Sequence, residues 1–224
     1  MKNFIFVLTA AITAFLLFSC ASAPPPKTFT VDLNSPRYEA GEIEANLDRY
    51  LSIGSIKKSP VNVYYYPNED AVCLQFKKQF VNCNQFWDKT GRDTFAAAFK
   101  RYQEEFEQKK LVNGNRRTRD VYGTVQGFFA WKKTPVSVQA KGSPKIGLGY
   151  QFRDKSVFFT TTQLESRYED PISRDRSQTS PVLLMYFTRA QAASLAELFS
   201  QEYLQRLGKP AAGTSGSAAA LDEY

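Results

Sequence analysis

Residues 146–152 read Ile-Gly-Leu-Gly-Tyr-Gln-Phe, a strict alternation of large apolar residues with glycine or glutamine. Successive side chains of a β-strand point to opposite faces of a sheet, so this pattern predicts a half-buried strand with one nearly bare face. A glycine-rich phosphate loop would need a helix directly after it, whereas here the strand pattern continues through both glycines. We therefore interpret this segment as part of a sheet and not as a phosphate site.

Strand patterns also occur on both sides of this segment. Runs rich in Val, Thr, Tyr and Phe, bounded by turn residues, predict strands at residues 61–66, 71–80, 121–131, 136–139, 157–164 and 182–187. The connections between consecutive strands are short, which favours hairpins and hence an antiparallel sheet. Two glycines inside the 121–131 strand, Gly123 and Gly127, indicate a bulge or a bend there.

Three segments show helical spacing instead. A helix is predicted to begin at the capping-box pattern of Thr90 and Asp93, and its apolar stripe consists of Phe95, Phe99, Tyr102 and Phe106. A second helix begins at the capping box of Thr188 and ends before Gly208. A short N-terminal helix is predicted over residues 42–51, where the apolar residues are spaced four apart: Ile43, Leu47 and Leu51.

These elements predict an α+β fold, with an antiparallel sheet of about six to seven strands, two main helices packed on it and a short N-terminal helix. The single domain is expected to span residues 37–209. It would follow a signal peptide, residues 1–19, and a lipidated cysteine with a proline-rich tether, residues 20–36. The Ala/Gly/Ser-rich end of the sequence, residues 210–224, is expected to be disordered.

The start of the sequence has the features of an export signal. Lys2 precedes a mostly apolar run from residue 4 to residue 18, which is shorter than the roughly 20 residues that a membrane-spanning helix needs. The run ends in Leu17-Phe18-Ser19-Cys20. This sequence resembles the lipobox of bacterial lipoproteins, although Phe18 is bulkier than the residue usual at its position. The resemblance implies cleavage before Cys20 and attachment of acyl chains to that cysteine.

The resemblance also implies a location. Two or three acyl chains hold a protein firmly on a bilayer, whereas a single chain binds only marginally. In the lipoproteins of many double-membrane bacteria, an aspartate after the cysteine retains the protein at the inner membrane. Ala21 occupies that position here, so the outer membrane is favoured over the inner membrane within the cell envelope. The prolines of residues 23–27 predict an extended spacer between the anchor and the domain.

Two further cysteines, Cys73 and Cys83, leave two alternatives open. If residues 77–79 form a turn, a hairpin that pairs residue 76 with residue 80 also pairs the two cysteines, and a disulfide is possible. If residues 71–81 form one continuous strand, the cysteines lie roughly 30 Å apart. The lack of Gly, Asn or Pro at 77–79 favours the continuous strand.

The composition excludes several classes of site. The chain contains no histidine, which excludes His-dependent catalytic triads and His-ligated zinc. We expect no cofactor, no metal and no catalytic set. The net charge of +7 favours anionic partners, and an exported protein rarely meets nucleic acid. If the predicted turns share one end of the sheet, their cations form a rim that contacts anionic headgroups or cell-wall glycan: Arg116, Arg117, Arg119, Lys132, Lys133, Lys141 and Lys145.

The expected function is that of a non-enzymatic envelope lipoprotein, anchored through Cys20, whose domain binds another envelope protein or a cell-wall component. An alternative is a lipid- or small-ligand-binding domain, with a pocket between strand 146–152 and the aromatic helix. A histidine-free hydrolase is a remote alternative, because the members of a Ser-Lys pair need not be neighbours in sequence.

Overall fold

The computed structural model describes residues 29–48, 56–113, 118–133, 139–153, 155–164 and 179–207. In chain order, its strands and helices are β1 (Tyr38–Asp48), β2 (Ile56–Tyr66), β3 (Ala71–Lys78), β4 (Val81–Trp87), α2 (Lys89–Glu107), β5 (Gly123–Gln126), β6 (Phe128–Lys132), β7 (Ala140–Gly142), β8 (Lys145–Arg153), β9 (Ser156–Gln163), β10 (Leu183–Phe187), α3 (Arg189–Phe199) and α4 (Gln201–Leu207). None of the helices in these ranges is both long and apolar enough to cross a membrane.

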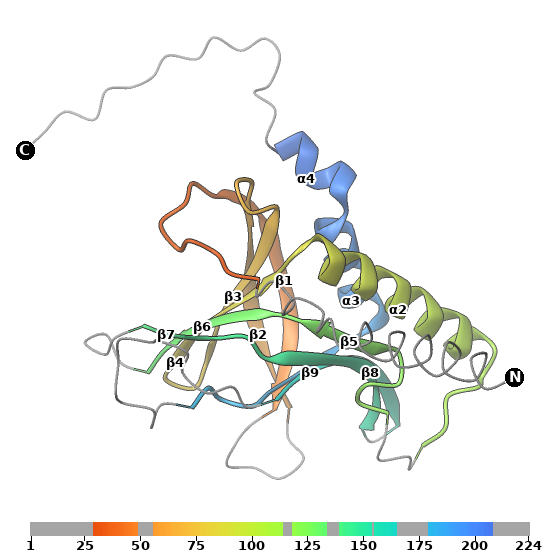
Figure 1. Cartoon of the computed structure of the whole chain (residues 1–224). Helices are drawn as coiled ribbons and strands as arrows, with labels where there is room; N and C mark the ends of the chain where they lie inside the picture. The colour runs from red at the N-terminus through yellow and green to blue at the C-terminus, as the bar shows by residue number, and fades with distance from the viewer. Residues whose placement is uncertain are drawn as a thin grey trace, which may run out of the picture.

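The strands form one antiparallel sheet in the order β5-β8-β9-β10-β1-β2-β3-β4-β6-β7. The sheet is strongly curved, like half of a barrel, and α2 and α3 lie side by side against it (Figure 1). The predicted α+β class with six to seven strands is therefore wrong, because ten strands dominate the fold and the helices are accessory.

The predicted helix at 42–51 is wrong, because its first seven residues lie in β1. Ile43, Ala45 and Leu47 alternate with polar residues and are buried against the sheet core. A spacing of four residues satisfies both a helix and a strand, since it is also a multiple of two. Ala45, with its small side chain, is the residue that completes the two-residue period.

The predicted strand at 71–80 is in fact a hairpin made of β3 and β4. The chain reverses at Gln79 and Phe80, and Gln79 takes a left-handed conformation with φ of +56°. Likewise, the predicted 121–131 strand divides at Gly127 into β5, which pairs with β8, and β6, which pairs with β4. A side chain at Gly127 would place its Cβ 2.7 Å from the Ile146 side chain, so glycine permits this crossing.

The two main helices were predicted, with errors at their ends. The cap of α2 is Asp88, whose carboxylate accepts a hydrogen bond from the Gly91 amide, and not Thr90. The capping box of Thr188 is confirmed. The second helix is not continuous, however, because Ser200 has an extended ψ of 136° and separates α3 from α4.

The face of the sheet that carries α2 and α3 is called the inner face. The aromatic stripe of α2 is buried there, with Phe95, Phe99 and Tyr102 packed around Phe159 of β9. Ring centroids in these pairs are 5.3–5.7 Å apart, which is the range of favourable aromatic contacts. The aromatic stripe of α2 is therefore part of the hydrophobic core.

A second apolar cluster covers the opposite, outer face. Phe29 and Leu33 pack there against strand residues such as Phe86 and Phe128, and the rings of Phe29 and Phe128 are 6.4 Å apart. Residues 29–36 were predicted to be tether, but their first part lies against the sheet. The predicted signal peptide, the strand predicted at 136–139 in all but its last residue, and the residues after 207 lie outside the described residues.

One more part of the outer face is covered by a loop. Thr118, Arg119 and Asp120 cross the glycine face of β8, where the Tyr150 amide donates to the Thr118 carbonyl at 3.0 Å. The strand prediction at 146–152 is confirmed by β8. One face of β8 carries only glycine at residues 147 and 149 because the backbone of Thr118 and Arg119 lies directly on it.

Candidate ligand-binding site

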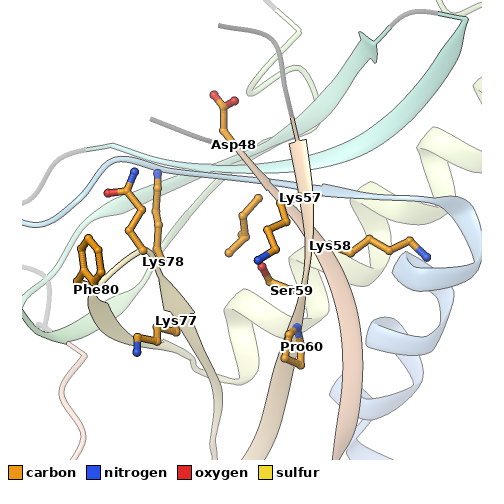
Figure 2. A pocket seen from close by; sticks show the side chains of 10 residues that line it. Asp48, Lys57, Lys58, Ser59, Pro60, Lys77, Lys78 and Phe80 are labelled. Carbon is orange, nitrogen blue, oxygen red and sulfur yellow. The ribbon is translucent and has the colours of Figure 1, made fainter. Parts of the chain in front are cut away.

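The sheet opens into two arms at one end. β2 pairs with β1 over residues 56–65, but it pairs with β3 only between residues 62–66 and 71–75. Beyond these pairs, the β1/β2 arm and the β3/β4 arm separate. A cavity of about 690 Å³, here called the arm cavity, lies between them (Figure 2).

The arm cavity combines apolar surface with positive charge. Its apolar lining comes from Leu47 and Pro60 of the first arm and from Phe80 at the tip of the second. Each arm also contributes two consecutive lysines, and these four are Lys57, Lys58, Lys77 and Lys78. Asp48 is the one carboxylate among the described lining residues.

The four lysines differ in their surroundings. Alternation along β2 puts Lys57 on the inner face, and Figure 2 shows its ammonium beside Ser59, inside the gap between the arms. Lys58 points away in the same view and forms an exposed ion pair with Glu44 at 3.1 Å, an interaction that contributes little to stability. Among the described residues, neither Lys57 nor Lys77 has an ion-pair partner.

Lys78 connects the second arm to the strand across the opening. Its ammonium donates a hydrogen bond to the carbonyl of Val182 at 2.5 Å, just before β10. Burial lowers the pKa of Lys78 from its ordinary value, because desolvation disfavours the charged form. The β3–β4 hairpin tip is thus held against the start of β10.

A second cavity of about 640 Å³ adjoins the first and shares Asp48, Lys78 and Gln79 with it. Arg119 and Lys133 add two more cations to its lining. The described residues that line the two cavities therefore include six cationic side chains and one carboxylate. This end of the sheet is strongly positive.

The predicted cationic rim is only partly assembled around these cavities. Arg119 and Lys133 lie together at the second cavity, while Arg116 and Arg117 lie outside the described residues. The three others line neither cavity: Lys132 and Lys141 lie on the paired strands β6 and β7, and Lys145 lies on β8, near the other edge of the sheet. The four arm lysines were missed, although each pair stands next to a strand end in the sequence.

The two cysteines do not form a disulfide, because both thiols are free. Cys73 pairs with Phe86 in the outer cluster, whereas Cys83 pairs with Phe76 in the inner cluster, so the sheet separates them. The continuous strand was also wrong, since the hairpin has a register that the sequence did not indicate. Burial raises the pKa of the Cys83 thiol to about 12 and raises that of Cys73 further, which makes both poor nucleophiles.

No group of three or more Cys, Asp or Glu side chains within the described ranges is arranged to hold a metal ion. On the inner face, buried Gln85 contacts two other uncharged side chains: its Oε1 accepts a hydrogen bond from Trp87 at 3.2 Å, and its Nε2 donates one to Gln163 at 2.8 Å. The arm cavity is therefore the part of the described structure best suited to bind a ligand.

Comparison with known proteins gives one match. No curated protein and no solved structure matches the chain. A family model described as "Uncharacterised Treponema protein" matches residues 26–206, a range that contains both arms and begins after Cys20. Because this match covers well over half of the sequence, the chain belongs to the family described as "Uncharacterised Treponema protein".

Proposed function

We propose that this chain is a lipid-anchored protein of the cell envelope whose domain binds, without chemical conversion, an anionic amphiphile in the arm cavity. The observation that carries the proposal is the composition of that cavity, whose lining combines lysines from two arms with the apolar side chains of Leu47, Pro60 and Phe80. Its volume lies within the roughly 300–1,000 Å³ that is usual for small-molecule sites.

The ligand class follows from the two kinds of lining. A carboxylate or phosphate head group would be paired with Lys57, which points into the gap between the arms. An alkyl chain would lie against Leu47, Pro60 and the ring of Phe80. The excess of cations over carboxylates disfavours cationic ligands and raises the local concentration of anions.

The arms favour a small ligand over an added protein strand. The facing edges of β2 and β3 are unpaired beyond residues 62 and 75, and such edges invite strand addition. However, Pro60 lacks a backbone N–H, and lysines occupy both edges. Proline and lysine are the residues that natural proteins use to prevent strand pairing.

Replacement of Lys57 should weaken binding of an anionic amphiphile. In calorimetric titration with dodecyl phosphate below its micelle concentration, Lys57→Gln should raise Kd about tenfold, because one charge-assisted hydrogen bond is lost. The matched control is Lys100→Gln on the exposed side of α2, which should leave Kd unchanged. Equal weakening by both variants, or no binding by the unchanged chain, would contradict the proposed site.

The anchor can be tested by counting thiols in the chain isolated from membranes. Cys73 and Cys83 are buried, so a folded chain with a thioether at Cys20 should not react with a chromogenic disulfide reagent. After denaturation, the same chain should show two reactive thiols. A chain without acylation would show one thiol when folded and three when denatured. As a control, Cys73→Ala should remove one thiol from the denatured count alone.

A further inference from the structure

We infer that the positive end of the sheet is a docking surface for an anionic bilayer, with the tip of the β3–β4 hairpin inserted among the lipids. This surface consists of the six cations that line the two cavities together with the exposed apolar residues Phe80, Leu164 and Val182. It extends beyond ligand binding, because the contact is with the membrane itself.

The apolar part of this surface consists of three exposed residues on two connected segments. Phe80 is 85% exposed at the hairpin tip, and Leu164 and Val182 are 59% and 49% exposed. The hydrogen bond from Lys78 to the Val182 carbonyl joins the hairpin tip to the start of β10. The pairing of Gln163 with Leu183 then puts Leu164 next to Val182. A large ring exposed at a hairpin tip has no partner among the described residues and would gain by leaving water.

The charge around these residues identifies the partner. An apolar tip surrounded by lysines matches the interface of an anionic bilayer, where rings enter between headgroups and ammonium groups stay at their level. Lysine stems are long enough to lie along apolar surface while their charges remain in water. A neutral bilayer offers the apolar contact alone.

The proposed anchor at Cys20 permits this orientation, and the inference rests on that part of the proposed function. Nine residues from Cys20 to Phe29 span at most about 32 Å when fully extended. Phe29 packs on Phe128, which pairs with Phe86, and the distance along β4 from Phe86 to Val81 is only about 17 Å. Anchor and hairpin tip can therefore reach the same bilayer.

The test uses the full chain reconstituted in vesicles that carry bromine on their acyl chains, which quenches tryptophan at short range. Phe80→Trp should lose emission in phosphatidylglycerol vesicles and keep it in phosphatidylcholine vesicles. Trp87 and Trp131 are buried and provide a constant background. Raising the ionic strength from about 0.01 M to about 0.15 M shortens the screening length from about 30 Å to about 8 Å and should reduce the quenching.

The matched control is Tyr38→Trp, an exposed aromatic at the opposite end of β1 that should not be quenched in either lipid. Equal quenching of both variants, or quenching of neither while both stay on the vesicles, would overturn the docking surface. A failed anchor gives a different result, because both variants would then leave the phosphatidylcholine vesicles together.

Discussion

Gly149→Ala is expected to lower the free energy of unfolding by about 3 kcal/mol or more, which is at the upper end for added volume in a packed site. A Cβ at this position would lie 1.7 Å from the Thr118 carbonyl oxygen and 2.7 Å from the carbonyl carbon of Arg119. Both are backbone atoms, which cannot rotate away as a side chain can. Urea titration monitored by the fluorescence of the buried tryptophans measures the change.

Gly147→Ala provides a graded control for this prediction. Its Cβ would be 2.9 Å from the Arg119 carbonyl oxygen, a milder clash with the same loop. The loss of stability should therefore be clearly smaller than for Gly149→Ala. If the two substitutions cost the same small amount, the loop from Thr118 to Asp120 does not lie tightly on β8.

This loop illustrates what the sequence can and cannot predict. The alternation in residues 146–152 was sufficient to predict β8, because the two-residue period is a local property. The segment that covers its glycine face comes from about 30 residues earlier in the chain. No local pattern in that segment indicates where it packs.

The errors in strand number have local causes. The sequence predicts three strands too few: its pattern indicates a helix in place of β1, one strand in place of the β3–β4 hairpin, and one strand in place of β5 and β6. Gln79 and Phe80 form a turn without Gly, Asn or Pro, so the usual turn residues gave no indication. With ten strands instead of six to seven, the sheet makes up most of the structure, and the fold is no longer of the predicted α+β class.

The sequence predicts the charge of the candidate site but not its location. Positive charge near turns pointed to an anionic partner, and Arg119 and Lys133 do lie at the second cavity. The arm cavity itself depends on where β2 and β3 stop pairing. This is a property of the sheet topology, and no spacing within either strand reveals it. The consecutive lysines of each arm were visible in the sequence, but their convergence was not.

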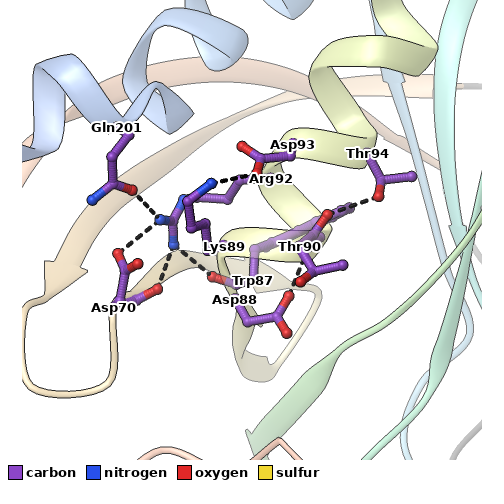
Figure 3. Close-up of polar contacts among 10 residues, drawn as sticks. Asp70, Trp87, Asp88, Lys89, Thr90, Arg92, Asp93, Thr94 and Gln201 are labelled. Carbon is purple, nitrogen blue, oxygen red and sulfur yellow. Dashed lines mark hydrogen bonds and ion pairs between the residues drawn. The ribbon is translucent and has the colours of Figure 1, made fainter.

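Arg92→Leu is expected to lower the free energy of unfolding by about 3 kcal/mol, because this guanidinium is 1% exposed and joins three elements. It donates to the Asp70 carbonyl at 2.5 Å and to the Asp70 carboxylate at 2.8 Å, in the turn between β2 and β3. It also donates to the Gln201 side chain of α4 at 2.9 Å (Figure 3). Leucine fills part of the volume but removes the guanidinium donor from all three acceptors, and leaves the Asp70 carboxylate with the Tyr65 hydroxyl in place of a cation.

A surface arginine on the same helix is the control for this prediction. Arg101 pairs with Glu105 at 3.0 Å, but its side chain is largely exposed, so Arg101→Leu should cost less than 1 kcal/mol. The difference between the two variants measures the contribution of burial, since both remove one guanidinium from α2. Equal losses would contradict the role of Arg92 in holding the β2–β3 turn and α4 together. If only Arg92→Leu lowers the free energy of unfolding strongly, the polar contacts at the start of α2 hold α4 against the sheet. These contacts lie at the end of β2 and β3 opposite the arm cavity.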